Sequence, residues 1–438
     1  MEVHRAGGKK KGDLSYLRSS TADDRCMAFR FTLDDFRFLT STAYPEIRAY
    51  IQGQTEKYAD PLRLQTALRL RFPDHTPAQL AAAAAQSALQ ARAARKCGMH
   101  PDALFTEATF EMASSAATAS LHRMLLRRGM EGQPDSHGGV IVDCCAGIGS
   151  DAVRFAQLAP VLAIEADPLL ARLCRHNLGL VSARGAVLAG NAEHWLPALR
   201  RDAVAALFAD PARRDEGGRH VRGSLYSPPL PTLLDVLPGV PSLVKIAPAA
   251  DADAPGWGRA FVAAGRECKE QLLHRDLGLP PVCVLRAEDA SLWTPGEHAP
   301  VAVRQPAWIM EAHNAVVRSG AVAQYFREYG AEPIDPRIAY GLADERPPDG
   351  VLHQSFRILE LLPFNRKRLR EAVRAHGFGP GTEIKKRGFP DTPEQLRAGL
   401  ALRGDRAGVI LIARQGTGHV MVLASREESA TQPAASEE

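Results

Sequence analysis

The stretch Val140-Ile-Val-Asp-Cys-Cys-Ala-Gly-Ile-Gly-Ser-Asp151 decides the fold of this chain. A short apolar run ends in Asp143, glycines follow at Gly147 and Gly149, and the next residues can form a helix. A second apolar run then ends in Glu165. This order of strand, glycine loop, helix, strand and acid predicts the nucleotide-binding half of a doubly wound α/β sheet.

The acid at the end of the first strand distinguishes between two possible ligands. A dinucleotide-binding loop has the pattern G-x-G-x-x-G, which lets a pyrophosphate bind at the helix N-terminus. This chain departs from that pattern at the first glycine position. A carboxylate at Asp143 would repel a pyrophosphate and suits the cationic amino acid end of S-adenosylmethionine (SAM). We therefore expect SAM as the cofactor, with Asp143 on its ammonium group and with Gly147 and Gly149 leaving room for the ligand. A plain strand-to-helix turn of another α/β protein is the alternative.

Two further strand ends complete the expected cofactor site. Glu165 ends the second strand, where a carboxylate can accept hydrogen bonds from both ribose hydroxyls, although a solvated loop acid is the alternative. Asn191 follows the third expected strand, and its side-chain oxygen could accept a hydrogen bond from the adenine amino group. The same Asn191 could instead cap the helix that follows it.

The stretch Phe208-Ala-Asp-Pro-Ala-Arg-Arg-Asp215 places an Asp-Pro turn at the end of the fourth expected strand. Enzymes that methylate amino groups often carry Asp/Asn-Pro-Pro-Tyr there, whereas Ala and Arg take the last two positions here. Asp210 and Pro211 are the expected catalytic residues, because methyl transfer to nitrogen needs mostly alignment and a proton acceptor. Arg213 and Arg214 could hold a phosphate or carboxylate of the substrate, or could form ion pairs with the acids that follow.

Bulk composition excludes several classes of protein. The chain has 438 residues, a formal net charge of +4 and seven cysteines without a C-x-x-C pair, which argues against a disulfide scaffold and against a zinc site. Its basic first residues lack the apolar core of a secretory signal, and no apolar run approaches the roughly 18 residues of a membrane span. We expect a cytoplasmic protein with no metal and no membrane partner.

One segment near the C-terminus concentrates positive charge. Residues 364–388 contain eight Lys and Arg residues and two acids. The net charge of this segment, about +6, therefore exceeds the +4 of the whole chain. Such a basic segment favours contact with a phosphate backbone, here through Lys385, Lys386 and Arg387. A solvated helix face is the alternative interpretation.

The order of the expected elements gives the organisation of the chain. Residues 33–126 are expected to be helical. Strands are expected near 140–144, 161–165, 185–189, 204–209, 242–247, 268–274 and 281–286, with helices near 150–158, 168–178, 192–200, 230–237 and 256–264. Residues 409–413 and 420–423 are expected to pair across a Gly416-Thr-Gly418 turn.

The chain resembles bacterial class I SAM-dependent methyltransferases that end in a THUMP-like domain. The motifs that carry the resemblance are Phe105-Thr-Glu-Ala-Thr-Phe-Glu-Met-Ala-Ser-Ser115, Asp143-Cys-Cys-Ala-Gly-Ile-Gly149, Asp210-Pro-Ala-Arg-Arg214, Tyr226-Ser-Pro-Pro-Leu230, Val244-Lys-Ile-Ala-Pro248, Leu361-Leu-Pro-Phe-Asn-Arg-Lys367 and Glu383-Ile-Lys-Lys-Arg-Gly388. The chain departs from the family pattern at Ser150, where a glycine is common, and at Asn191, where an acid is common.

The resemblance implies a fold and a substrate class. It implies an N-terminal helical region (1–104), a Rossmann-like methyltransferase domain (105–295), a ferredoxin-like insert (306–350) and a THUMP-like domain (355–425). The acidic, Ser- and Ala-rich composition of the last residues predicts a disordered tail (426–438). True THUMP domains accompany tRNA-modifying enzymes, so the resemblance implies methylation of RNA, either tRNA or rRNA, with a base nitrogen as the preferred acceptor. The alternatives are a methyltransferase for a small molecule or protein, and a non-catalytic RNA-binding protein with a vestigial SAM pocket.

Overall fold

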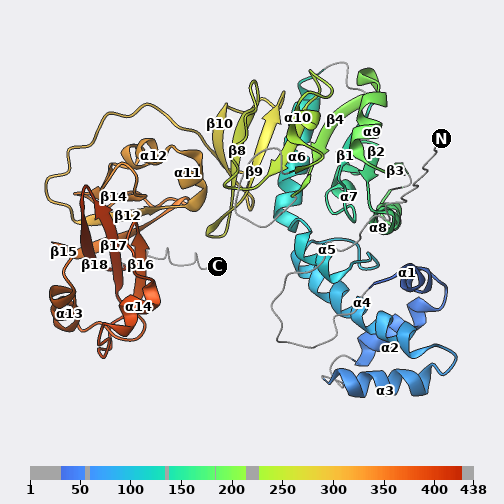
Figure 1. Ribbon diagram of the computed structural model, residues 1–438, viewed down its shortest axis with the longest axis horizontal. Helices are drawn as coiled ribbons and strands as arrows, with labels where there is room; N and C mark the ends of the chain where they lie inside the picture. Colours follow the sequence, from blue (N-terminus) through green and yellow to red (C-terminus); the bar gives the residue numbers. More distant parts are fainter. Residues whose placement is uncertain (1–30, 55–59, 134–137, 183, 214–225, 427–438) are drawn as a thin grey trace, which may run out of the picture. The chain divides into compact units, whose positions relative to one another are not determined.

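The computed structural model describes residues 31–54, 60–133, 138–182, 184–213 and 226–426 (Figure 1). The chain divides into two compact units that meet between Ser87 and Ala88, within helix α4. Arg214 and the expected tail from residue 427 onward lie outside the described residues.

The first unit is helical, as the sequence predicts. It contains α1 (Leu33–Leu39), α2 (Tyr44–Gln54), α3 (Pro61–Arg71) and the first part of α4 (Pro77–Lys96). Thr32 caps α1 and Asp60 caps α3, so backbone N–H groups at both helix starts have acceptors. Apolar side chains such as Phe38, Ile47 and Leu68 are buried and form the interior of this unit.

The second unit contains a nine-stranded sheet in the order β11-β10-β8-β9-β7-β4-β1-β2-β3 (Figure 1). Its strands are β1 (Val140–Cys144), β2 (Val161–Glu165), β3 (Gly185–Ala189), β4 (Val204–Ala209), β7 (Ser242–Ile246), β8 (Gly258–Ala264), β9 (Glu267–Arg275), β10 (Val282–Arg286) and β11 (Leu292–Trp293). Strands β7, β4, β1, β2 and β3 are parallel, and β9 is antiparallel to both β7 and β8. The Rossmann-like, doubly wound sheet expected from the sequence is confirmed.

The expected helix at 256–264 was wrong. Residues Gly258–Ala264 form strand β8, which pairs antiparallel with β9 and parallel with β10. The alanine-rich sequence suits a helix locally, but the two neighbouring strands give each backbone group a partner and bury Phe261 and Val262. Tertiary pairing therefore overrides the local preference.

Helices cover both faces of the parallel strands. They are α6 (Ala116–Glu131), α7 (Ala152–Phe155), α8 (Pro168–Gly179), α9 (Ala192–Trp195) and α10 (Leu230–Leu234), with short 3-10 helices η2 (Leu196–Ala198) and η3 (Arg201–Ala203). Helix α5 (Glu107–Met112) precedes α6 and contacts α4 through the ring of Phe110. Phe208 of β4 contacts His122 of α6 and Phe155 of α7, with ring centroids 5.0 and 5.2 Å apart. Side chains of α9 and α10 pack against Val142 of β1 and Leu207 of β4 in a separate cluster. Because successive side chains of a strand point to opposite faces, Leu207 lies on the face opposite to that of Phe208.

A seven-stranded sheet follows, in the order β13-β14-β12-β15-β18-β17-β16. Its elements are β12 (Trp308–Ala312), α11 (Asn314–Ser319), α12 (Val322–Glu328), β13 (Glu332–Pro333), β14 (Tyr340–Ala343), β15 (His353–Pro363), α13 (Arg366–Ala375), β16 (Glu383–Arg387), α14 (Pro393–Ala398), β17 (Val409–Gln415) and β18 (Gly418–Ser425). The predicted pairing of β17 with β18 across the 416–418 turn is confirmed. Residues of the expected ferredoxin-like insert and of the expected THUMP-like domain share this sheet through the pairing of β12 with β15.

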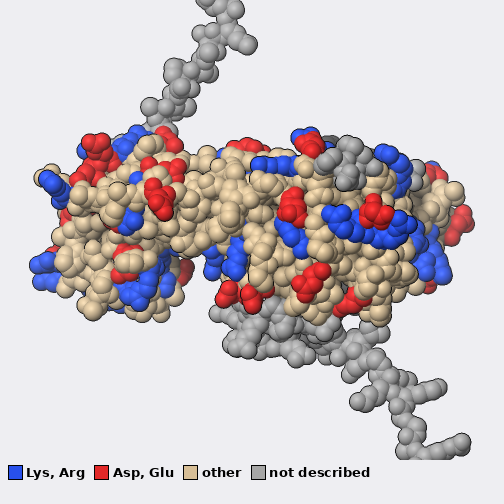
Figure 2. Space-filling view, turned by 90° about the horizontal axis from the view of Figure 1, so that it is seen from above, with Lys and Arg blue, Asp and Glu red and all other residues tan. Residues whose placement is uncertain are grey.

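The surface carries charges of both signs. On the face seen in Figure 2, groups of Lys and Arg side chains alternate with acidic and uncharged ones. Within the described residues, no helix combines the length and the apolar character that crossing a membrane requires.

Candidate active site

Three of the predicted site residues meet at the carboxyl ends of neighbouring strands. Asp143 on β1 is in register with Phe208 of β4, and β1 pairs with β2, which ends at Glu165. Asp210 directly follows β4, and its backbone N–H donates to the carbonyl of Cys144 at 3.2 Å. The strand order turns back between β1 and β4, which is where doubly wound sheets bind their ligands.

Asp143 is a buried acid without a partner. Its side chain is 1% exposed, and neither carboxylate oxygen has a hydrogen-bond partner among the described residues. Burial, together with the charges of Asp151, Asp210 and Glu165, raises the pKa of Asp143 well above its usual range. A buried carboxylate with no donor is costly unless a ligand supplies one, so this position suits a cationic group.

The glycine loop after β1 is shaped for close approach of a ligand. Gly147 has φ +56° and Gly149 has φ +83°, conformations that side chains rarely adopt. A Cβ at Gly149 would lie 2.9 Å from the sulfur of Cys174, whereas a Cβ at Gly147 would meet no protein atom within 4 Å. Gly149 is therefore needed for packing, and Gly147 borders open space.

Glu165 fixes the loop at the same edge. One of its oxygens accepts a hydrogen bond from the backbone N–H of Gly147 and the other from that of Asp167, both at 2.8 Å. Each oxygen keeps a second lone pair, so the carboxylate can still accept ribose hydroxyls. Asn191 occupies the N-cap position of α9 but forms no side-chain capping bond there, and it is exposed. Its side chain is therefore available for the predicted contact with adenine.

The Asp-Pro turn is anchored by a lysine. Lys245 of β7 donates to a carboxylate oxygen of Asp210 at 2.8 Å, and Pro211 is buried. The next two residues form strand β5 (Ala212–Arg213), which pairs with β6 (Tyr226–Ser227). Burial raises the pKa of Asp210, and the charge of Lys245 opposes that increase. Asp210 is therefore a positioned carboxylate that accepts a proton more readily than an exposed one.

A buried network of charges extends behind Asp210. His122 of α6 is fully buried, with its Nδ1 2.8 Å from Asp151 and its Nε2 2.6 Å from Glu270. Glu270 lies on β9, and its second oxygen is 3.7 Å from the Nζ of Lys245. Asp210, Lys245, Glu270, His122 and Asp151 thus form one continuous chain of alternating charge.

The network holds its two cations in the charged form. Burial opposes the charge of His122, but Glu270 and Asp151 outweigh it and raise the pKa of His122 to about 10. The charges of Asp210 and Glu270 likewise outweigh burial and raise the pKa of Lys245. With Asp143 included, the acids of this region outnumber its cations, which again favours a cationic ligand.

Of the five residues in this network, the sequence pointed only to Asp210. The Asp-Pro turn marked Asp210, whereas Lys245 stood only within the Val244-Lys-Ile-Ala-Pro248 motif and had no catalytic role assigned to it. His122 and Glu270 are separated by 148 positions in the chain, and no local motif connects them. Asp151 directly follows the glycine loop, and its position there was the one signal that could have pointed to it.

The predicted RNA contacts on β16 lie in a different environment. The Nζ of Lys385 is 2.6 Å from Glu311, Lys386 donates to the carbonyl of Phe389 at 2.8 Å, and Arg387 is 3.6 Å from Glu311. All three are partly buried. The charged groups of Lys385 and Lys386 are thus engaged within the same domain, whereas Arg387 is held less closely.

Comparison with known proteins defines the class. A family model described as THUMP domain-like matches residues 353–426. The chain is 31% identical over 373 residues to an uncharacterised S-adenosylmethionine-dependent methyltransferase of Mycobacterium tuberculosis strain CDC 1551 / Oshkosh, and to its counterpart in strain ATCC 25618 / H37Rv. That match covers 80% of this chain and 96% of either relative. A suspected methyltransferase from Porphyromonas gingivalis W83, known from its crystal structure, has the same fold, with a TM-score of 0.68, 22% identity and coverage of 88% of this chain and 99% of that one.

The chain therefore belongs to the family of SAM-dependent methyltransferases. Within that class, it is a member with a C-terminal THUMP-like domain. The residues at the strand ends fit the cofactor, because the unpartnered oxygens of Asp143 can accept its ammonium group and Glu165 can accept its ribose hydroxyls. SAM supplies a methyl group activated by a positively charged sulfur.

Proposed function

We propose that this enzyme methylates a base nitrogen in RNA, either tRNA or rRNA. The observation that carries the proposal is the carboxylate of Asp210, held by Lys245 at the switch point of the sheet beside Asp143. A fixed acceptor at that edge can align an amine and take up its proton. Asp143, Gly147, Gly149, Glu165 and Asn191 are the proposed cofactor site.

In this proposal Lys245 is a positioning residue. Its ion pair with Asp210 fixes one carboxylate oxygen and leaves the other oxygen for the amine. Glu270 and His122 hold Lys245 in turn, so the turn after β4 is fixed by side chains from three separate elements. Orientation of this kind supplies much of the rate in a displacement reaction.

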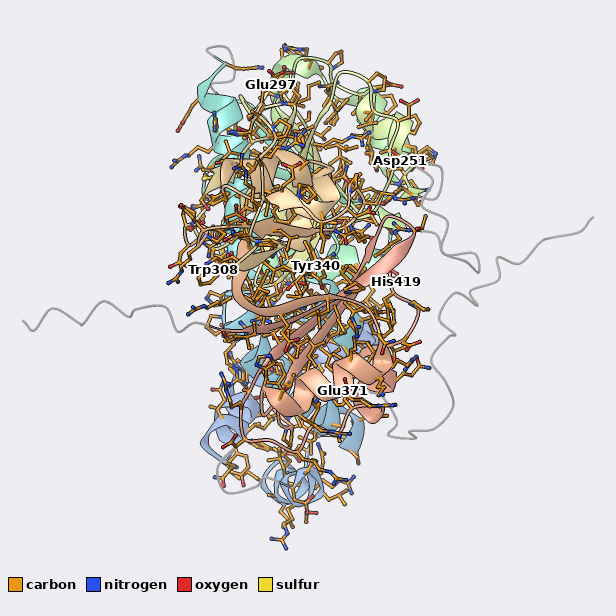
Figure 3. All side chains as sticks on the ribbon, turned by 90° about the vertical axis from the view of Figure 1, so that its left-hand side faces the viewer. Asp251, Glu297, Trp308, Tyr340, Glu371 and His419 are labelled. Carbon is orange, nitrogen blue, oxygen red and sulfur yellow. The ribbon has the colours of Figure 1, made fainter. Side chains whose placement is uncertain are left out.

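RNA binding is assigned chiefly to the THUMP-like domain. The exposed face of α13 carries Lys367, Arg368 and Arg374, and none of these forms a salt bridge with a described residue. Glu371, labelled in Figure 3, is the only acid of this helix. Clustered exposed cations of this kind bind phosphates by releasing counterions. Contact of Lys385, Lys386 and Arg387 with RNA, and of Arg213 and Arg214 with the substrate, remains part of the proposal.

The direct test is methyl transfer from radiolabelled SAM into total RNA from a strain that lacks the protein. Label should enter one RNA size class and be lost with Asp210→Asn, while SAM binding by that variant should persist. Label in protein or in small molecules, with none in RNA, would overturn the RNA assignment and favour the alternative substrates.

The docking surface has its own test. Replacing Lys367 and Arg368 with Glu should weaken RNA binding and flatten its dependence on salt, because two phosphate contacts become repulsive. The matched control replaces Arg63 and Arg69 of α3, which are also exposed, with Glu. Equal losses of affinity in both variants would show that net charge, and not the face of α13, determines binding.

A further inference from the structure

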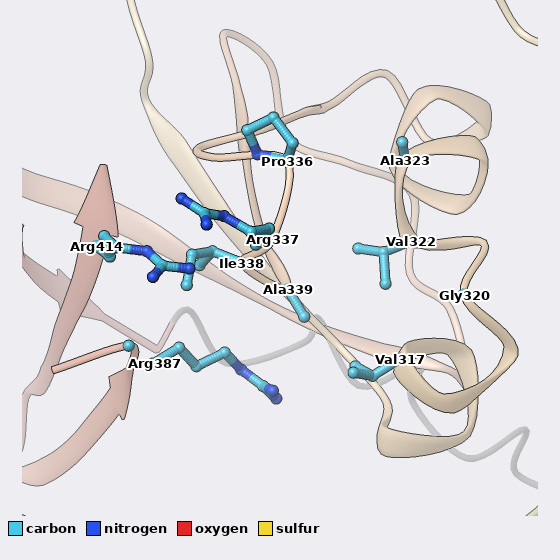
Figure 4. A pocket seen from close by; sticks show the side chains of 11 residues that line it. Val317, Gly320, Val322, Ala323, Pro336, Arg337, Ile338, Ala339, Arg387 and Arg414 are labelled. Atoms are coloured by element: carbon cyan, nitrogen blue, oxygen red, sulfur yellow. The ribbon is translucent and has the colours of Figure 1, made fainter. Parts of the chain in front are cut away.

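A cavity of about 560 Å³ is lined by residues of α11, α12, the segment 336–339 before β14, the end of β16 and β17. Three arginines line it, namely Arg337 before β14, Arg387 at the end of β16 and Arg414 on β17. In Figure 4 their side chains approach the cavity from one side, and Val317 and Val322 face it from α11 and α12. The cavity thus has a cationic side and an apolar side.

The arginines are incompletely neutralised. Arg414 forms no salt bridge with any described residue, and Arg337 is 3.8 Å from Asp335. Both oxygens of Asp335 already accept backbone N–H groups, from Arg337 and from Gly416. Arg387 is 3.6 Å from Glu311, but Lys385 lies closer to the same acid, at 2.6 Å. The two nearby acids, Asp335 and Glu311, thus face four cations, namely the three arginines and Lys385.

Two of the arginines also have donors without acceptors. The Nε–H groups of Arg387 and Arg414 are buried and have no hydrogen-bond partner in the part of the chain that the structure describes. A buried donor left unpaired is unfavourable, and both of these donors belong to arginines that line the cavity. The guanidinium of Arg387 lies 5.4 Å from the centre of the Tyr340 ring, which restrains its orientation.

We infer that this cavity binds a nucleotide through its phosphate. Guanidinium groups match phosphate oxygens in geometry and charge, and three of them suit a doubly charged terminal phosphate. The apolar wall of Val317, Val322 and Ala323 would contact the base or sugar. The volume falls within the roughly 300–1,000 Å³ typical of ligand sites. The ligand is either a free nucleotide or the phosphorylated end of an RNA, and the inference does not depend on RNA being the methyl acceptor.

The test is calorimetric titration of the full chain with AMP, in the presence of excess S-adenosylhomocysteine so that the cofactor site cannot take up the nucleotide. AMP should bind and adenosine should not. Arg414→Gln should weaken AMP binding about tenfold or more, as expected for loss of a charge-assisted contact. Arg403→Gln, which removes an exposed arginine outside the cavity, should leave the affinity unchanged.

A second variant guards against misfolding as the cause of any loss. Ala323→Phe narrows the cavity without removing a charge and should also weaken AMP binding, while its melting temperature stays near that of the parent protein. Absence of AMP binding, or AMP binding that both cavity variants leave unchanged, would overturn the inference. A 5′-phosphorylated oligoribonucleotide that binds more tightly than its 5′-hydroxyl counterpart, with the difference lost in Arg414→Gln, would identify an RNA end as the ligand. Equal affinity of the two oligoribonucleotides would identify a free nucleotide.

Discussion

Asp143→Asn tests the placement of the cofactor directly. The substitution keeps the shape of the side chain but removes a carboxylate that has no hydrogen-bond partner among the described residues. Truncating one partner of a buried charge pair typically costs about 2–5 kcal/mol, a roughly 30-fold to several-thousand-fold loss of affinity. In the free enzyme the pKa of Asp143 is raised well above its usual range. Part of the favourable free energy of binding a cation is therefore offset by removing the proton from the Asp143 carboxyl. We therefore expect a loss near the lower end, about 30-fold, at pH 7.

The sign of the pH dependence follows from the same raised pKa. An ammonium group prefers the ionised carboxylate, so binding of SAM should release a proton from Asp143. Over the pH range in which the ligand's amino group stays charged, SAM should therefore bind the parent protein more tightly as pH rises. The Asn variant has no such proton to release, and its affinity should not follow this trend. Titrations in buffers of different ionisation enthalpy measure the released proton.

Comparison of two ligands shows which cationic group Asp143 meets. S-adenosylhomocysteine keeps the ammonium group but has a neutral sulfur, so Asp143→Asn should weaken it by the same factor as SAM. Asp276→Asn, on the turn between β9 and β10, is the matched control and should change neither affinity. Unchanged binding of both ligands to the Asp143 variant, or pH-independent binding by the parent protein, would refute the reasoning.

Other perturbations probe the network and the loop. His122→Gln should lower the free energy of unfolding by about 3–5 kcal/mol in urea titrations, because Asp151 and Glu270 lose the buried cation between them. In the parent protein the pKa of His122 is raised from 6.5 to about 10, so its stabilisation should be complete below pH 6.5 and fall as pH rises through 10; this decline should be absent from the variant. Gly149→Ala should lower the melting temperature, since its Cβ would lie 2.9 Å from a cysteine sulfur at φ +83°. Asp210→Asn should reduce the methylation rate about 10²- to 10⁴-fold while SAM affinity persists in calorimetry.

Local sequence patterns predicted most of the parallel strands, because apolar runs that end in acids or glycines mark buried strands and their loops. The bounds of β1, β2 and β3 agree with those expected. Strand β8 was missed because its alanines suit a helix, and only pairing with β9 and β10 makes it a strand. Local preference could not reveal that pairing.

The candidate site was predictable only where each residue stands at the end of its own strand. Asp143, Glu165 and Asp210 could be found in this way. His122 and Glu270 could not, because each lies within an ordinary helix or strand and gains its role only when the fold brings the two within 2.6 Å. The ion pair of Lys385 with Glu311 could not be predicted either, because Glu311 lies on β12, far from the basic run of β16 in the sequence. From the sequence alone, that run was predicted to contact a phosphate backbone.

The electrostatics of the strand ends constrain how an RNA substrate could be held. The acids that raise the pKa of Asp143 and suit a cationic cofactor would repel a phosphate backbone at the same edge. Affinity for a polyanion must then come from elsewhere in the chain, and the THUMP-like domain supplies exposed cations on α13. The cavity lined by Arg337, Arg387 and Arg414 offers a more selective site for a phosphate. RNA binding and methyl transfer would then depend on different parts of the chain. Loss of the α13 cations should raise KM for RNA, whereas loss of Asp210 should lower kcat.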